Sequence, residues 1–403
     1  MQRILAGILT AALTIGAPAV AFSQNAACQG GKSFEAWLGD VRKEALEQGI
    51  SQKAIDAGLA GVTYDQATVG KDHGGQGVFA QNFVQFSDRM ANNNRLQAGK
   101  AKINSHATVF ERIKEEYGVP AGVLTAFWGL ETDFGGFLGS GDTVRSVATL
   151  AYDCKRPELF RPQLFALLKI IDRGDLTRAE MRGPFAGELG QFQFLPTRYI
   201  DFGVDFDGDG HINLIKSDAD ALGSAANYLK SLGWKADEPW LVEVKVSPNV
   251  PWDQADLSTE HPPEQWTQWG VTRADGKPIT GPNSSMLLPM GRHGPAFLAY
   301  PNFKNVYLTW NQSLTYSITA AYLATRLEGA APMSKGDGTP DLDVAGVKQV
   351  QQLLQQKGYD VGKIDGIIGA GTRAAIKKEQ LRLRQPADSY PSTELLQALQ
   401  AGK

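Results

Sequence analysis

Apolar side chains at helical spacing are the feature that most limits the fold of this chain. In "FEAWLGDVRKEALEQGISQKAIDAGL", residues 34–59, the side chains of Phe34, Trp37 and Val41 fall on one helical face. The stretch "INSHATVFERIKEEYGV" predicts another helix, which closes at Gly118. Further helices are expected at 158–172, 218–232 and 313–328. Helices therefore dominate the first two thirds of the chain, and the sequence predicts a mainly α fold.

The composition of the sequence changes between residues 240 and 310. Many Pro, Gly and Trp residues surround the short apolar runs "WLVEVKV" and "FLAYP", which predicts a small strand-bearing insertion in the helical domain. The segment "EGAAPMSKGDGTPD" has no apolar period and predicts a linker. After it, "VKQVQQLLQQKGYDVGKIDGIIGAGTRAAIKKEQLRL" predicts helices around a Gly-rich turn. We therefore expect a helical domain at 32–328, a flexible linker at 329–341 and a small helical module at 342–403.

The first residues, "MQRILAGILTAALTIGAPAVAFSQ", resemble a secretory signal. Arg3 precedes an apolar run, and small residues follow at Ala19 and Ala21, so we expect a signal peptide at 1–23. A retained anchor is the alternative, but Pro18 breaks the run before it reaches the roughly 20 residues that a spanning helix needs. The mature protein is expected in a bacterial periplasm.

The chain has two cysteines, Cys28 and Cys154. An oxidising compartment favours a disulfide between them. Two buried thiols remain the alternative, because the sequence does not give the distance between the two residues.

Charge and motif content exclude several functions. The formal net charge of -3, from 40 basic and 43 acidic residues, creates no field that would attract nucleic acid. The five histidines form no HExxH pair, and two cysteines are too few for the usual zinc sites. The chain has no G-x-S-x-G elbow, and "GVTRADGKP" lacks the spacing of a phosphate loop. Serine hydrolases and nucleotide enzymes are therefore not expected.

The stretch "FWGLETDFGG", residues 127–136, places a carboxyl group beside apolar side chains. If a helix starts near Pro120, then Leu124, Phe127 and Glu131 share one face. Desolvation raises the pKa of such a carboxyl group, so that it stays protonated and serves as a proton donor. The alternative is an ordinary solvated or paired residue of the last helical turn.

A second stretch, "GPFAGELGQFQFLPTRY" at 183–199, mixes glycines, amides and aromatic rings. Amides suit the hydroxyl and acetamido groups of a sugar, and rings suit its flat faces. A glycine-rich helix junction with core phenylalanines is the alternative.

The sequence "DFDGDGHIN" predicts a calcium loop. Asp205, Asp207 and Asp209 occupy positions 1, 3 and 5, and Gly210 occupies position 6. Position 12 is Lys216 instead of glutamate, so a later carboxylate, Asp218 or Asp220, would have to complete the site. A solvated acidic turn is the alternative.

Several stretches occur together in an order that resembles the membrane-bound lytic transglycosylase B family. They are "WGLETDFG", "LATLAYDCKRPELF", "AGELGQFQFLPTRY", "DFDGDGHINL", "ALGSAANYL" and "YLTWNQSLTYSITAAYLA". The tail is similar to the three-helix peptidoglycan-binding module that accompanies such enzymes. The resemblance implies a lysozyme-like helical domain that cleaves the β-1,4 bond between N-acetylmuramic acid (NAM) and N-acetylglucosamine (NAG) and leaves a 1,6-anhydro end.

The resemblance also implies roles for individual residues. Glu131 matches the single catalytic glutamate, acting first as acid and then as base. The remaining matches are substrate residues and calcium ligands: Gln193, Tyr228 and Tyr316 for the substrate, and Asp205, Asp207, Asp209, His211 and Asp220 for a structural calcium ion. No cofactor is expected for catalysis.

The chain departs from many family members at two positions near the second stretch. Pro184 stands where a small polar residue is common, and Glu188 stands where alanine is common. The expected partners are peptidoglycan strands, together with proteins of the cell-wall machinery, and we expect a monomer. A lysozyme-type hydrolase and a wall-binding protein without turnover are the rival interpretations.

Overall fold

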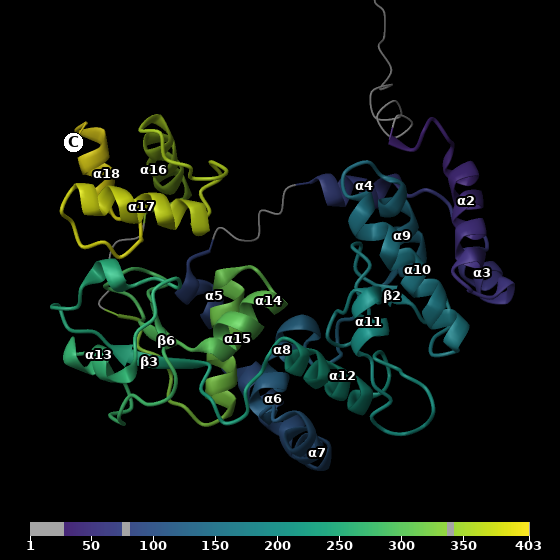
Figure 1. Cartoon of the computed structure of the whole chain (residues 1–403), viewed down its shortest axis with the longest axis horizontal. Coiled ribbons are helices and arrows are strands. Elements are labelled where there is room, and N and C mark those ends of the chain that lie inside the picture. The colour runs from purple at the N-terminus through teal and green to yellow at the C-terminus, as the bar shows by residue number, and fades with distance from the viewer. Residues whose placement is uncertain (1–27, 75–80, 337–341, 403) are drawn as a thin grey trace, which may run out of the picture.

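The computed structural model describes residues 28–74, 81–336 and 342–402. The predicted signal peptide at 1–23 lies outside these residues. Across the described ranges, none of the helices is both long enough and apolar enough to cross a membrane. Figure 1 shows a mainly helical molecule with a few short strands, which confirms the predicted fold class.

The helical domain contains most of the helices. They are α2 (Phe34–Glu47), α3 (Gln52–Leu59), α4 (Gln66–His73), α5 (Phe83–Met90), α6 (Asn93–Ser105), α7 (Ala107–Tyr117), α8 (Ala121–Thr132), α9 (Thr143–Tyr152), α10 (Pro157–Arg173), α11 (Pro196–Phe202), α12 (Asp218–Ser231) and α15 (Leu314–Leu327). The pattern at 34–59 forms two helices, because Gly49 has a positive φ of 82° and Ser51 caps α3 by accepting a hydrogen bond from the Ala54 amide.

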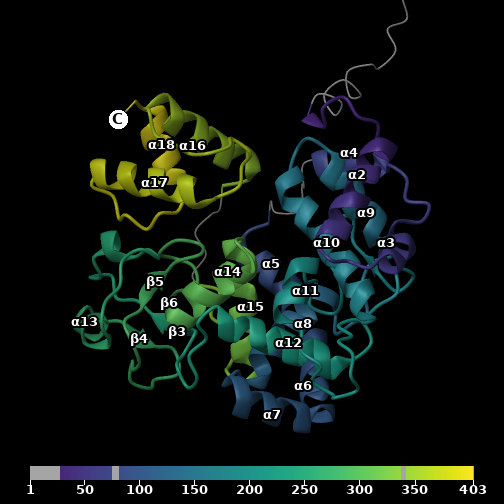
Figure 2. The same ribbon diagram turned by 45° about the vertical axis from the view of Figure 1, so that its right-hand side comes forward.

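Helix α8 lies at the centre of the helical domain and carries Glu131. It packs against α6, α7, α12 and α15, an arrangement visible in Figure 2. Every residue from Gly122 to Leu130 is buried, so the helix is enclosed on all sides and not along one stripe. Glu131 is partly exposed and is the helix's one charged residue. The packing therefore fixes the position of a single carboxyl group.

The predicted strand-bearing insertion is present. Strands β3 (Leu241–Lys245), β4 (Thr272–Arg273), β5 (Ser285–Leu287) and β6 (Phe297–Ala299) form an antiparallel sheet in the order β4-β3-β6-β5. Short helix α13 (Pro263–Gln268) places Trp266 in a separate apolar core. After β6, a π-helical turn, η3 (Phe303–Tyr307), leads into the single turn α14 (Leu308–Trp310). After the sheet, the chain thus returns to the helical domain, where α15 packs against α8.

The C-terminal module contains three helices around its own core: α16 (Val344–Gln356), α17 (Ala370–Arg382) and α18 (Thr393–Gln400). It also contacts the insertion directly. The Arg373 guanidinium donates to the carbonyl oxygens of Leu288 at 3.2 Å and Pro289 at 2.7 Å, and Lys377 pairs with Asp256. The module is therefore docked on the insertion as well as joined through the linker.

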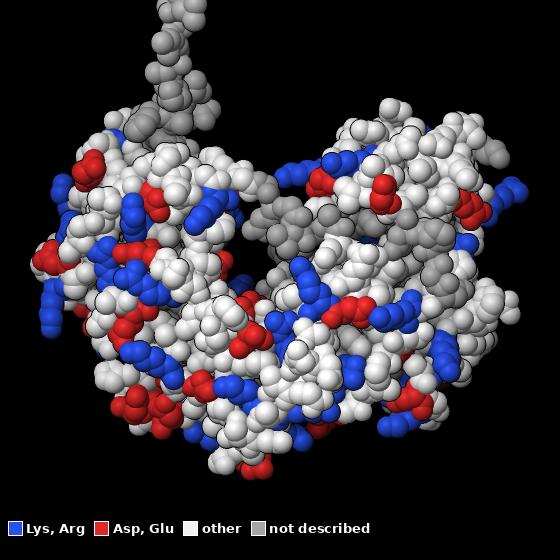
Figure 3. Space-filling view, turned by 180° about the vertical axis from the view of Figure 1, so that it is seen from behind, with Lys and Arg blue, Asp and Glu red and all other residues white. Residues whose placement is uncertain are grey.

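Two further features fix the outline of the helical domain. Cys28 and Cys154 form a disulfide with a Cα–Cα distance of 5.9 Å, which ties the N-terminal arm to the end of α9. A two-stranded ribbon joins β1 (Gly141–Asp142) to β2 (Arg182–Gly183). In Figure 3 the surface is hollowed between the part that contains α2, α9 and α10 and the part that contains the sheet and the module.

Candidate active site

Glu131 accepts two hydrogen bonds on the same oxygen. The indole Nε1 of Trp310 donates to Oε1 over 2.8 Å, and the hydroxyl of Tyr316 donates to Oε1 over 2.5 Å. Oε2 takes part in neither bond. The arrangement holds the carboxyl group in one orientation and keeps its second oxygen for another partner.

The surroundings raise the pKa of Glu131 above its ordinary value. Desolvation is the largest cause, and the charge of Glu188 adds to it. The hydrogen bonds from Tyr316 and Trp310, together with the charge of Arg198, act in the opposite direction without reversing the shift. Glu131 can therefore hold a proton at a pH where an exposed glutamate has lost it, which suits a general acid.

Trp310 organises the aromatic side of the site. Its ring stacks on Phe127 with a centroid distance of 4.4 Å, and the rings of Tyr228 and Phe194 lie 5.6 and 5.8 Å away. Trp310 is the last residue of α14, and Tyr316 lies in the first turn of α15, where its backbone N–H donates to the capping hydroxyl of Ser313. The interruption between the two helices allows both side chains to reach Glu131.

The predicted substrate residue Gln193 lies at the tip of a tight loop. Leu189 and Phe194 exchange backbone hydrogen bonds of 2.8 and 2.9 Å, and Gln193 has a positive φ of 51°. Its side-chain amide donates to the carbonyl of Gly190 over 2.9 Å. The neighbouring Gln191 is buried instead and accepts from the Trp128 indole over 2.7 Å. Gln191 thus supports α8, while Gln193 is partly exposed.

Tyr228, also predicted as a substrate residue, is buried beside Arg198. The Arg198 guanidinium lies 4.8 Å from the centroid of the Tyr228 ring, and burial raises the pKa of the Tyr228 hydroxyl. Arg198 lies on α11, and its positive charge acts to lower the pKa of Glu131. The structure thus brings Glu131, Tyr316 and Tyr228 together around Trp310.

The predicted calcium loop gathers three of its five proposed ligands. Ligand oxygens of Asp205, Asp207 and Asp209 all lie within 4.8 Å of one another. Carboxylate oxygens in such a group fit a hard cation such as calcium. Desolvation raises the pKa of Asp205, but amide hydrogen bonds from the loop outweigh it and lower the pKa overall.

Asp220 and His211 lie differently from the three aspartates. Asp220 is buried, and its carboxylate accepts from the amides of Phe206, Asp207 and Asn213. His211 is exposed, and its amide donates to Asp209 over 2.8 Å. The carboxylate of Asp220 therefore joins the backbone of the loop to the first turn of α12.

Sequence reasoning gave no role to Trp310, Arg198 or Glu188. Trp310 had no signal of its own, because its contact with Glu131 depends on the path of the chain through the insertion. Arg198 lies within the quoted stretch at 183–199. Its position, five residues after the predicted substrate residue Gln193, could have indicated that Arg198 lies near the site.

Comparisons with known proteins agree with this geometry. The model of the transglycosylase SLT domain matches residues 33–325, and a peptidoglycan binding domain model matches residues 343–399. Membrane-bound lytic murein transglycosylase B of Escherichia coli (strain K12) is 28% identical over 238 residues, which span 59% of this chain and 64% of that relative. The match thus spans less than two thirds of the relative's length.

Solved structures are also similar. SltB3 from Pseudomonas aeruginosa in complex with NAG-anhNAM-pentapeptide superposes with a TM-score of 0.84 at 37% identity, covering 92% of this chain and 100% of that chain. The Escherichia coli lytic transglycosylase Slt35 in complex with bulgecin A gives a TM-score of 0.60 at 25% identity, covering 72% of this chain and 91% of that chain. These findings confirm the resemblance seen in the sequence. The family model of the transglycosylase SLT domain covers well more than half of the residues and includes the helix that bears Glu131. The chain therefore belongs to the transglycosylase SLT domain family.

Proposed function

We propose that this protein is a lytic murein transglycosylase that cleaves the β-1,4 bond between NAM and NAG and leaves a 1,6-anhydroNAM end. The observation that carries the proposal is the carboxyl group of Glu131, whose Oε1 accepts from Trp310 and Tyr316 while Oε2 stays out of both bonds. SltB3, which is 37% identical, has been crystallised with NAG-anhNAM-pentapeptide and with NAG-NAM-pentapeptide. A compound with an anhydro ring is the product that this reaction predicts.

Glu131 acts twice in the proposed reaction. Its carboxylic acid first protonates the glycosidic oxygen, the bond from that oxygen to C1 of NAM breaks, and the acetamido group of NAM stabilises the positive charge at C1. The Glu131 carboxylate then removes the proton of the C6 hydroxyl, whose oxygen bonds to C1 and closes the ring. Glu131 ends protonated as it began, and no water is consumed.

The intramolecular attack explains why one carboxyl group is enough. A well-oriented hydroxyl on the same sugar replaces a separate nucleophile, a change worth up to about 7 to 11 kcal/mol of the barrier. Trp310 and Tyr316 would hold Glu131 in place for both proton transfers. Gln193 and Tyr228 are proposed to bind the sugars on either side of the bond that is cleaved.

We also propose that the loop with Asp205, Asp207 and Asp209 binds calcium as a structural ion. Asp220 would support the loop from α12 through the hydrogen bonds that its carboxylate accepts from the backbone amides of Phe206 and Asn213. His211 would contribute its backbone carbonyl, as position 7 of such loops does. Calcium would stabilise the fold and take no part in bond cleavage.

The remaining proposals concern location and substrate. An exported monomer would meet peptidoglycan in the periplasm, and the module at 342–403 would bind the same polymer as the catalytic domain at 32–328. The disulfide between Cys28 and Cys154 suits an oxidising compartment.

The mass of the products tests the reaction. Purified peptidoglycan digested by the enzyme should yield muropeptides with anhydroNAM ends, each lighter by one water than the corresponding product of hydrolysis. Muropeptides with reducing NAM ends would identify a lysozyme-type hydrolase, and the absence of soluble products would identify a binding protein.

A further inference from the structure

Glu188 is the one polar side chain in the loop from Gly183 to Leu189. Its backbone is held on both sides. The Gly187 amide donates to the Pro184 carbonyl over 3.3 Å, and Leu189 is paired with Phe194. A Cβ atom on Gly183 would lie 2.1 Å from the carbonyl oxygen of Glu188, so the start and the end of the loop are in close contact. The loop therefore presents Glu188 from a rigid backbone.

One oxygen of the Glu188 carboxyl group lacks a hydrogen-bond partner within the described part of the chain. Oε2 is buried and makes no hydrogen bond there, although the residue as a whole is only partly buried. Arg156 is the cation whose charge acts on Glu188, but the Arg156 guanidinium already pairs with Asp72. A buried carboxyl oxygen without a donor costs free energy. The fold thus retains an acceptor that it does not satisfy.

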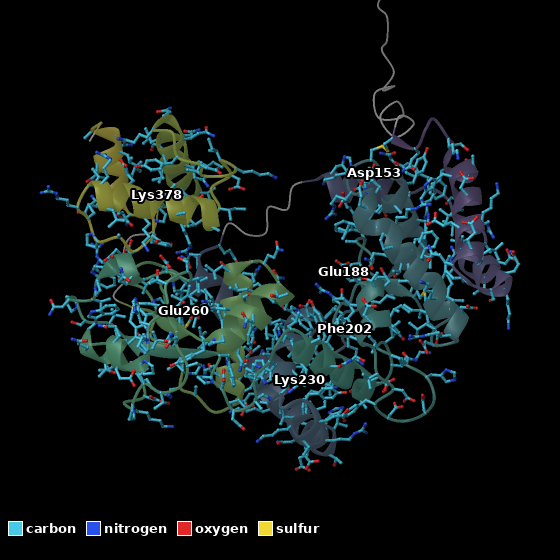
Figure 4. All side chains as sticks on the ribbon, viewed as in Figure 1. Asp153, Glu188, Phe202, Lys230, Glu260 and Lys378 are labelled. Carbon is cyan, nitrogen blue, oxygen red and sulfur yellow. A yellow bond between two sulfur atoms is a disulfide. The ribbon has the colours of Figure 1, made fainter. Side chains whose placement is uncertain are left out.

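The loop that carries Glu188 lies close to the surroundings of Glu131. The next residue, Leu189, pairs with Phe194, whose ring lies 5.8 Å from Trp310, the donor to Glu131. The charge of Glu188 also helps to raise the pKa of Glu131. Figure 4 shows Glu188 on the side of its part of the molecule that faces α14, and Figure 3 shows that the surface between the two parts is hollowed. A glycan bound beside Glu131 would therefore pass Glu188.

We infer that Glu188 is a substrate-positioning residue, whose unpartnered carboxyl oxygen accepts a hydrogen bond from a hydroxyl or acetamido N–H group of the bound sugar. The inference rests on the proposed function. The last side-chain torsion of glutamate is broad and roughly two-fold, so the carboxyl group can turn either oxygen toward a ligand at little cost. Burial raises the pKa of Glu188, so the contact is strongest above that pKa, where the carboxyl group is ionised and its hydrogen bonds are stronger than neutral ones.

The test uses the full chain and a soluble tetrasaccharide of alternating NAG and NAM. For Glu188→Ala we expect kcat/KM to fall about 10-fold, the loss expected for one hydrogen bond to a charged group. Glu188→Gln, which keeps an acceptor oxygen, should recover part of that loss. Both variants should melt at or above the wild-type temperature, because each removes a buried carboxyl group without a donor. Glu115→Gln makes the same chemical change on the exposed face of α7 and should match the wild type.

A binding measurement separates this inference from the proposed function. In the Glu131→Gln background, adding Glu188→Ala should weaken tetrasaccharide binding about 10-fold by calorimetry. Binding of the tetrasaccharide by the wild type without cleavage would contradict the proposed function but not the role of Glu188. Equal affinity with and without Glu188→Ala, or a loss that follows a lower melting temperature in both Glu188 variants, would overturn the role of Glu188.

Discussion

Trp310 donates its indole N–H to Oε1 of Glu131 over 2.8 Å, although the two residues lie 179 positions apart in the chain. Helix α8 carries Glu131, the proposed acid, and the chain that follows the strand-bearing insertion carries the hydrogen-bond donor Trp310. The charge state of Glu131 therefore depends on where the insertion places α14 and α15 relative to α8.

The hydrogen bond from Tyr316 can be tested through the pH dependence of activity. It favours ionised Glu131 and so lowers the pKa of that group, and Tyr316→Phe should raise this pKa further above the ordinary value. The proposed reaction requires protonated Glu131, so kcat/KM should fall as pH rises through this pKa. The variant's fall should lie at higher pH, with a lower maximum because the acid is less well oriented. Tyr359→Phe removes a hydroxyl bond of 2.9 Å to Glu379 in the module and should leave the profile unchanged. A fall at the wild-type pH in Tyr316→Phe would contradict the assignment.

Glu131→Gln should strongly reduce cleavage and stabilise the fold. The amide keeps the shape but transfers no proton, so activity should fall about 100- to 10,000-fold. The raised pKa means that the contribution of Glu131 to wild-type stability is greatest below the ordinary pKa of glutamate and is lost as pH rises through the folded-state value. The variant should therefore melt above the wild type at pH 8, with the difference shrinking toward pH 4. Substantial release of muropeptides by the purified variant would mean that another residue is the acid.

Much of the fold was predictable because helical spacing and caps are local signals. Gly118 ends α7 in a left-handed conformation, as predicted, and the runs at 240–246 and 297–301 contain β3 and β6. The surroundings of Glu131 were not predictable from spacing. The burial of α8 on all sides and the approach of Trp310 are tertiary, and the resemblance alone suggested Tyr316. Glu188 appeared in the sequence as a departure from the family pattern, and its missing hydrogen bond is visible only in three dimensions.

Calcium should raise the melting temperature without changing kcat. An ion that binds only the folded state adds about 2.7 kcal/mol when its concentration is about 100-fold above its Kd. Asp205→Ala should remove the response, because Asp205 accepts the amides of Gly208 and Gly210 and belongs to the group of three carboxylates. Asp253→Ala, at an exposed aspartate of the insertion, should keep it. Identical melting curves of the wild type in millimolar calcium and in chelator would reduce the loop to an acidic turn.

Loss of the disulfide should destabilise the helical domain. Cys28 and Cys154 are separated by 126 positions, so reduction frees a long loop in the unfolded chain. Replacing both with serine should lower the free energy of unfolding by about 2 to 4 kcal/mol in denaturant titrations. A reductant should destabilise the wild type by a similar amount and leave the double variant unaffected. Two free thiols in the unreduced protein, counted by alkylation and mass, would contradict the pairing.

The last prediction concerns the C-terminal module, and the structure decides where to cut the chain. Met333 packs in the core of the helical domain, and the Ser334 amide donates to Glu243 over 2.7 Å. A chain ending at Gly329 would lose both contacts, so the truncation should end at Gly336. The module's described polar contacts are with the insertion, at Leu288, Pro289, Asp256 and Arg292, so the truncated enzyme should keep Glu131 and its donors in place.

The truncated enzyme should cleave small soluble glycan fragments as fast as the full chain but lose retention and activity on intact sacculi. A docked wall-binding module raises the local concentration of polymer at the site and leaves the transition state unchanged. Arg373→Ala with Lys377→Ala in the full chain weakens docking without detaching the module, since the contacts with Leu288, Pro289 and Asp256 are removed while Arg292 keeps its contacts with Asp388 and Glu394. That variant should still pellet with sacculi. Equal pelleting of the full and truncated chains, or a truncated enzyme inactive on soluble fragments, would show that the module completes the fold of the catalytic domain or has another role.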